Sequence, residues 1–365
     1  MRPVNKPSSN SLYAPPASIT FAKANAQLLR KMTGAVPPVG NYTVSLAQVL
    51  RWLLGIARGR RFTRLTAAEQ KTLVAALEGR VAAIYKTAAA PLVQDLGAYC
   101  SYCGSDLPAQ VEVEHTVPKS LYPLFSTDWR GFLLSCSPCN KAKRQSPARA
   151  DVIQWSKLKR PTERDLYDEI RVHRYLWPDL DPTCWEDAPA HLFYLDVATN
   201  QWLPVSVADS VDFANKFLVY DVPNHRVLAD IKHGTAILQN VQVAVRVEAV
   251  LLKPWVDDMI DLLLLNEDLV NPAKATYDRR QMNRTRAWFN ALDACRQLSI
   301  ATDQKTFDFL WQPIPGWAAG SAFYSVWLTV LQHFRDPSGM SYASRLVADT
   351  NVPLYYPNTE TTHLP

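Results

Sequence analysis

Two Cys-x-x-Cys pairs constrain the fold of this chain more than any other feature of its sequence. The first pair is Cys100 and Cys103, and the second is Cys136 and Cys139. The N-terminus is polar and proline-rich and shows no signal-peptide pattern, so we expect reduced thiols that bind metal rather than disulfides. Four thiolates around one Zn²⁺ form a closed tetrahedral site that stabilises a small fold and performs no chemistry. The sequence therefore predicts a structural zinc site.

The segment between the pairs predicts a strand that carries an acid and an imidazole. The run VEVEHTV has the β-branched alternation that is typical of a strand, with Glu114 and His115 at its end. Glu112 shares a strand face with Glu114, and we interpret it as a surface residue, with contact to the metal as the alternative. We expect a two-stranded hairpin that brings the two cysteine pairs together.

A short helix should follow the second pair. Ser137 is expected to be the N-cap and Pro138 the first helical residue, and the helix should end before Pro147. Asn140 and Lys143 are three residues apart and therefore share a face of this helix. The expected unit places Glu-His on a strand opposite Asn and Lys on a helix.

The combination of CSYC, VEHTVPKS and FLLSCSPCNKAK resembles the HNH endonucleases, in the branch whose ββα-metal fold is held by a four-cysteine zinc. The resemblance covers residues 98–150 and implies metal-dependent hydrolysis of DNA phosphodiester bonds. It implies that His115 is the general base. Glu114 and Asn140 would be ligands of a catalytic Mg²⁺ or Mn²⁺, separate from the zinc, and Lys143 would hold a phosphate.

The chain departs from the family pattern at Gly131, where members of this branch usually carry the Asn that supports the loop holding the base. Two hypotheses follow. In the first, the nuclease is active and a neighbour such as Asp128 or Arg130 replaces that Asn. In the second, the protein is a zinc-stapled nucleic-acid-binding or assembly protein with a degenerate nuclease centre.

The rest of the sequence predicts three regions. Residues 1–95 form a basic arm with helices, residues 96–160 the HNH nuclease module, and residues 161–365 a larger acidic domain of short strands followed by helices. Helices are expected over 45–57 and after a capping box of Thr66 and Glu69. In the third region we expect a hairpin over 191–207 that turns near Asn200, and helices over 212–220 and 233–265. The expected fold class is α+β and mainly α-helical.

Charge is divided unevenly between these regions. Residues 1–99 contain 13 Lys+Arg and 3 Asp+Glu, whereas residues 161–365 contain 17 and 26. A basic front suggests a polyanion partner, and we expect DNA contacts at Arg58, Arg60 and Arg61. The alternative is that these charges only keep the protein soluble and that their uneven distribution has no functional meaning. The acidic part is the expected surface for a protein partner or for self-association.

Location and partners complete the expectations. No stretch approaches the roughly 20 uninterrupted apolar residues of a membrane helix. We therefore expect a cytoplasmic protein with no membrane partner. HNH proteins with large appended domains resemble effectors of bacterial anti-phage systems, so a partner ATPase or another defence-system protein is expected beside DNA.

Overall fold

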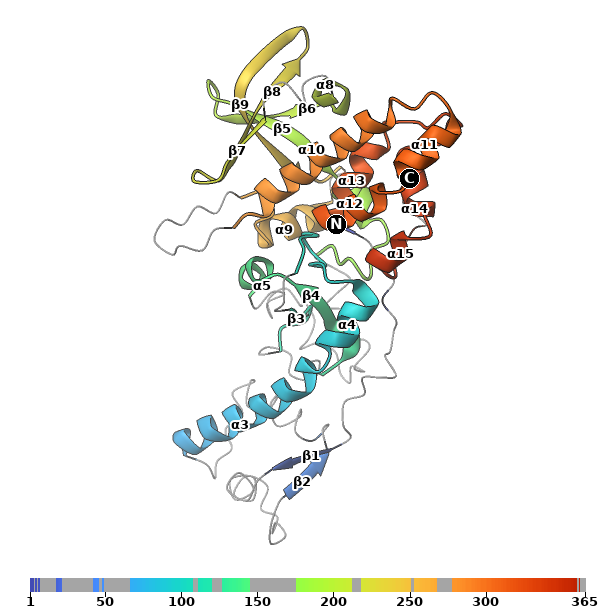
Figure 1. The fold of residues 1–365 in the computed structure, drawn as a ribbon. Coiled ribbons are helices and arrows are strands. Elements are labelled where there is room, and N and C mark those ends of the chain that lie inside the picture. Colours follow the sequence, from blue (N-terminus) through green and yellow to red (C-terminus); the bar gives the residue numbers. More distant parts are fainter. Residues whose placement is uncertain are drawn as a thin grey trace.

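The computed structural model describes most of the chain from residue 66 onward. The described residues are 1, 2, 4, 6, 18–21, 42–45, 48, 66–107, 111–119, 127–144, 175–211, 218–250, 253–267, 278–359 and 361. They form a mixed α and β structure, with a large sheet at one end, a small two-stranded sheet in the middle and a long helix reaching toward the other end (Figure 1).

The large sheet has five antiparallel strands in the order β6-β5-β9-β8-β7. Strands β5 (Ala190–Asp196) and β6 (Gln201–Val205) form the predicted hairpin, with Asn200 in the turn at a positive φ of 55°. The other three strands are β7 (Leu218–Asp221), β8 (Arg226–His233) and β9 (Ala236–Val247).

The prediction of a helix over 233–265 is wrong for most of its length, and the helix predicted over 212–220 is wrong at residues 218–220, whereas residues 212–217 lie outside the described part of the chain. Residues 218–221 and 236–247 are strands, and the helical part of the second range is α9 (Pro254–Leu262). Valines recur at every second position from Val241 to Val247. This spacing puts the valines on one face of a strand, and β9 pairs along its two edges with β5 and β8.

Helix α10 (Arg280–Leu298) packs against β9 and α13 (Tyr324–Leu331), and its buried face belongs to the larger hydrophobic core. Trp288 and Leu292 of α10 are in this core with Trp327 of α13 and Val245 of β9. The other helices described after residue 175 are α7 (Cys184–Asp187), α8 (Val207–Val211), α11 (Gln304–Trp311), α12 (Ile314–Ser321), α14 (Tyr342–Ala348) and α15 (Val352–Tyr355).

The predicted capping box is confirmed at the start of α3 (Ala67–Lys86). The Thr66 amide donates to Glu69 Oε2 at 2.9 Å, and the Glu69 amide donates to Thr66 Oγ1 at 3.3 Å. The strands β1 (Ser18–Phe21) and β2 (Tyr42–Ser45) pair with each other. The helix expected over 45–57 falls almost entirely outside the described residues.

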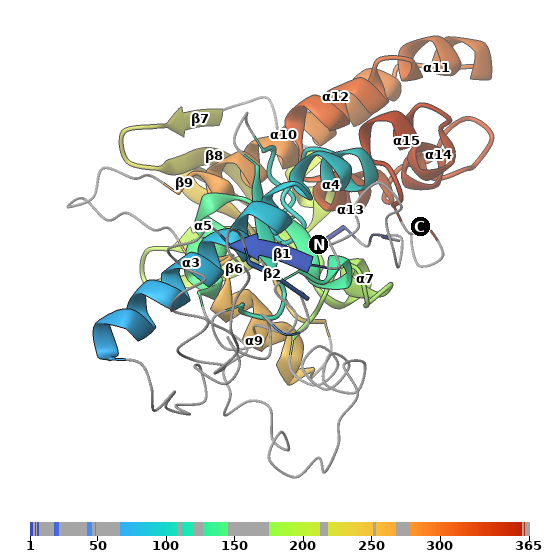
Figure 2. The ribbon, with the colours of Figure 1, turned by 90° about the horizontal axis from the view of Figure 1, so that it is seen from below.

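A second hydrophobic core joins segments that are distant in sequence. It contains residues of α4 (Ala89–Leu96), the buried β4 (Phe132–Ser135), Trp177, α9 and Leu265. The end of α4 lies beside the segment after α15, where Asn358 donates to the Asp95 carbonyl at 3.0 Å (Figure 1 and Figure 2).

In the part of the chain that the structure describes, no helix combines the length and apolar character needed to cross a membrane.

Candidate metal centre and acid-histidine site

The four cysteines of the two Cys-x-x-Cys pairs lie together. The Sγ atoms of Cys100, Cys103, Cys136 and Cys139 are all within 4.8 Å of one another, and those of Cys103 and Cys136 are 3.7 Å apart. Thiolates around zinc at bond lengths of about 2.3 Å would be separated by about 3.8 Å in a regular tetrahedron. The predicted cluster is therefore confirmed, and its geometry fits a metal such as zinc.

Two tight turns bring the cysteines together. The first pair follows α4 in a loop where the Gly104 amide donates to the Cys100 carbonyl at 2.9 Å, and Gly104 has the positive φ of 77° that glycine favours. This loop is tied to β4 by the Ser101 amide, which donates to the Leu134 carbonyl at 2.9 Å. The second pair lies where β4 ends and α5 (Ser137–Lys143) begins.

The predicted helix is present, but its N-cap differs from the expected one. Helix α5 begins at Ser137 and not at Pro138, and the N-cap is Cys136. The Cys136 carbonyl accepts from the Asn140 amide at 3.0 Å, so the helical hydrogen bonding starts one residue earlier than predicted. The helix ends at Lys143, which confirms that it stops before Pro147.

The four thiols differ in how readily they ionise: hydrogen bonds with Cys100 and Cys103 raise the pKa of Cys136, burial raises the pKa of Cys139, and the pKa of Cys103 is lowered. Burial opposes ionisation of Cys103, but hydrogen bonds from the other three cysteines hold the pKa of this thiol well below its ordinary value. Arg280 adds to this effect, and its Nη1 donates to Cys139 Sγ at 2.9 Å. A buried thiolate stabilised by charge-assisted donors is the form that binds a metal ion.

The strand predicted to carry the acid and the histidine is also present. Strand β3 (Glu112–His115) pairs antiparallel with β4, so that Glu114 lies opposite Leu133 and His115 opposite Phe132. Successive side chains on a strand alternate between its faces. The acid and the imidazole consequently contact different neighbours.

Glu114 is paired with Lys143 of α5. The two side chains are 6% and 1% exposed, and Lys143 Nζ lies 2.7 Å from Glu114 Oε1 and 2.7 Å from the His115 carbonyl oxygen. Burial raises the pKa of Glu114, and the Lys143 ammonium opposes this shift. In this arrangement Lys143 neutralises an internal carboxylate.

Asn140 is paired with Glu112 and not with Glu114. Its Nδ2 donates to Glu112 Oε2. This hydrogen bond is a second link between α5 and β3, two strand positions before the Glu114 carboxylate that pairs with Lys143. Glu112 was interpreted from sequence as a surface residue, yet it is half-buried and contacts a candidate metal ligand. Its position two residues before Glu114, on the same strand face, was the signal for this placement.

The His115 ring lies between aromatic rings on α3 and β4. It makes edge contacts with Tyr85, at 4.6 Å between ring centroids, and with Phe132, at 5.1 Å. Lys119 Nζ donates to the Tyr85 hydroxyl at 2.6 Å. The C-terminal end of α3 therefore helps to position the imidazole.

The loop around Gly131 is supported by backbone and hydroxyl contacts. The Thr116 amide and hydroxyl both donate to the Gly131 carbonyl, at 2.8 and 3.1 Å. A Cβ added at Gly131 would lie 3.6 Å from Thr116 Oγ1, an ordinary contact, so the backbone does not require glycine here. Asp128 and Arg130, the candidate substitutes for the family Asn, form an ion pair with each other at 2.5 Å.

Arg58, Arg60 and Arg61 lie outside the described residues. Arg280 was missed by sequence reasoning, because it lies 141 residues from the cysteine that it contacts. The basic run around it gave no indication of a contact with the cluster.

Searches with this chain found no matching protein-family model, curated protein or solved structure.

Proposed function

We propose that the unit formed by β3, β4 and α5 is the catalytic module of a metal-dependent HNH endonuclease that hydrolyses DNA phosphodiester bonds. The observation that carries the proposal is the antiparallel pair bearing Glu114 and His115, with α5 contacting β3 through Lys143 and Asn140 beside the cysteine cluster. This combination of an acid, an imidazole, an amide and an ammonium supplies a base, hard oxygen ligands and a cation for phosphate.

His115 would act as the general base on the attacking water. A neutral imidazole has one ring nitrogen that can accept a proton from water. The edge contacts with Tyr85 and Phe132 restrict the orientation of the ring. A base held in one orientation keeps its acceptor nitrogen aimed at the water.

Glu114, Glu112 and Asn140 are the oxygen donors that would hold Mg²⁺ or Mn²⁺. When bound, such an ion neutralises charge on the phosphate and on the leaving 3′ oxygen. Lys143 and the metal ion are alternative counter-charges for the same Glu114 carboxylate. A lysine released from that carboxylate would be free to contact a phosphate oxygen.

The second candidate function is a zinc-stapled nucleic-acid-binding or assembly protein with a degenerate nuclease centre. Two observations favour it: the Glu114 carboxylate is already neutralised by Lys143, and Gly131 replaces the Asn typical of the family. Both hypotheses share the cysteine cluster. They differ in whether DNA is cut.

Cleavage of a supercoiled plasmid in Mg²⁺ or Mn²⁺ tests the proposal. We expect His115→Gln to lower the cleavage rate by about 100-fold or more, since a general base contributes on the order of 10²–10⁴. Glutamine keeps much of the side-chain volume of histidine, so the substitution should not leave a cavity beside Tyr85 and Phe132.

The matched control is Tyr85→Phe. It removes the hydroxyl that Lys119 contacts and leaves an aromatic ring beside His115. We expect this variant to cut within a few-fold of the wild type. Cleavage by His115→Gln at the wild-type rate, under matched salt and metal, would contradict the assignment of the base. A wild type that retains zinc and cuts neither plasmid nor linear DNA would favour the second candidate.

A further inference from the structure

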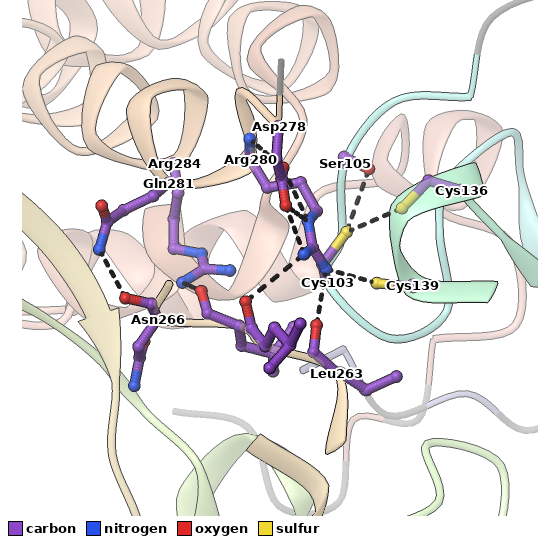
Figure 3. Close-up of polar contacts among 12 residues, drawn as sticks. Cys103, Ser105, Cys136, Cys139, Leu263, Asn266, Asp278, Arg280, Gln281 and Arg284 are labelled. Carbon is purple, nitrogen blue, oxygen red and sulfur yellow. Dashed lines mark hydrogen bonds and ion pairs between the residues drawn. The ribbon is translucent and has the colours of Figure 1, made fainter. Parts of the chain in front are cut away.

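Arg280, the first residue of α10, reaches across to the cysteine cluster (Figure 3). Its Nη1 donates to Cys139 Sγ at 2.9 Å and to the Leu263 carbonyl at 3.1 Å. Asp278 holds the other edge of the guanidinium, with Nε 2.9 and 2.8 Å from its two carboxylate oxygens. Both side chains of this ion pair are buried, at 5% and 6% exposure. The guanidinium is thus fixed with one N–H directed at a metal-ligand sulfur.

A second arginine of α10 lies one turn further along the helix. Arg284 is 1% exposed, and its Nη1 donates to the Leu265 carbonyl at 3.1 Å and to the Val245 carbonyl at 3.4 Å. Its Nη2 has no hydrogen-bond partner among the described residues. Burial lowers the pKa of Arg284 to about 10, and the Cys103 sulfur acts in the opposite direction. A buried cation of this kind requires negative charge nearby.

A metal-loaded cluster supplies that negative charge. Four thiolates around one divalent zinc leave two negative charges in excess, and these sulfurs are buried or half-buried in the second hydrophobic core. Hydrogen bonds from outside the ligand set stabilise such sulfurs and orient them for the metal. A bound metal would also hold Cys139 Sγ in line with Arg280 Nη1, and its loss would leave this contact without a fixed acceptor.

We propose that Arg280 is a positioning residue of the metal centre, and that it couples metal occupancy of the four-cysteine cluster to the docking of α10 against the unit of β3, β4 and α5. The coupling is reciprocal: the metal stabilises the docked helix, and the docked helix raises the affinity for the metal. Helix α10 is thereby held against the unit of β3, β4 and α5 by electrostatic attraction as well as by apolar packing. This inference rests on the cysteine cluster and is independent of nuclease activity.

Zinc affinity measured by chelator competition tests one side of this coupling. We expect Arg280→Gln to weaken zinc binding by about tenfold or more, as loss of a partner of a metal ligand does. Arg280→Lys keeps the charge and loses the planar fork, so its affinity should be intermediate. The control is Arg296→Gln in the last turn of the same helix, where Arg296 is 38% exposed and pairs with Asp293. This control should bind zinc like the wild type.

Hydrogen exchange of the wild-type chain, with zinc and after its removal, tests the other side. We expect amides 140–144 of α5 and 283–286 of α10 to lose protection together, while amides 328–331 of α13 keep theirs. If removal of zinc simply unfolded the protein, the amides of all three segments would lose protection. In Arg280→Gln, zinc should still protect α5 and should no longer protect the start of α10.

Two results would overturn the inference. The first is equal protection of residues 283–286 with and without zinc in the wild type, a measurement that needs no variant. The second is a folded Arg280→Gln protein with wild-type zinc affinity. Neither measurement involves DNA, so the inference can fail while the nuclease proposal stands, and the nuclease proposal can fail while the inference stands.

Discussion

Lys143 illustrates how the surroundings of a residue change its chemical interpretation. On sequence it is a basic residue sharing a helix face with Asn140, which suits contact with a phosphate. In the structure it is 1% exposed, and its ammonium lies between the Glu114 carboxylate and the His115 carbonyl. A buried ammonium is stable only where such oxygens replace its water.

The Glu114–Lys143 pair gives a stability prediction. Lys143→Met should destabilise the protein by about 3–5 kcal/mol, because it leaves the Glu114 carboxylate buried without a counter-charge. The double variant Glu114→Gln/Lys143→Met should recover much of this loss. Thermal unfolding of the wild type, both single variants and the double variant completes the cycle. If Lys143→Met melted at the wild-type temperature, the pair would not be buried as described.

The cysteines give the second prediction at this scale. We expect one zinc per chain by elemental analysis, and Cys136→Ser should lose the metal and unfold the unit of β3, β4 and α5, since binding energy at such a site is largely folding energy. Cys295→Ala is the control, because Cys295 is buried in α10 and is not part of the cluster. That control should retain zinc. Purified protein without zinc, or an unchanged melting curve for Cys136→Ser, would refute the assignment.

At the scale of elements, local signals succeeded where one short segment determines the structure. The Thr66–Glu69 capping box and the turn of the β5–β6 hairpin depend on neighbours within a few residues, and both are present. Strand β9 was mistaken for a helix because its apolar residues fit either period over a short window. Its pairing with β5 and β8 decides the structure, and that pairing is set by tertiary contacts.

The candidate site follows the same division. The cysteine spacing predicted the cluster, and the residues on β3 and α5 were predicted to face each other. The pairing of Asn140 with Glu112, and of Lys143 with Glu114, depends on the exact rotation of α5 over β3, which spacing alone does not determine. Arg280 reaches Cys139 only because the tertiary fold places the first residue of α10 near the cysteine cluster, so no local pattern could identify it.

At the scale of the whole molecule, the unit of β3, β4 and α5 and the C-terminal part share a hydrophobic core. Cys139 of α5, Trp177 and Met259 of α9 belong to the same buried cluster. A fragment beginning near residue 161 would expose that core to water, so its properties would not represent the intact protein. Charge reversal in the full chain is therefore the better way to examine the uneven charge distribution.

DNA affinity of the full chain, measured by fluorescence anisotropy over a salt series, tests whether the basic front faces DNA. The variant reverses Arg58, Arg60 and Arg61 to Glu, in a region with 13 Lys+Arg against 3 Asp+Glu. Each lost phosphate contact should reduce the slope of log K against log salt by about 0.9. Affinity should fall about equally for unrelated DNA sequences, because phosphate contacts position the protein without reading bases.

The control for this variant carries the same change in net charge within the acidic part of the chain. It reverses the exposed residues Arg226, Lys305 and Arg335 to Glu. If the basic front faces DNA, this control should bind with nearly the wild-type affinity and salt slope, because screening weakens charges more than about 10 Å from the phosphates. Equal losses in the two variants would mean that binding responds only to total charge. An unchanged front variant would place the DNA-binding surface elsewhere on the molecule.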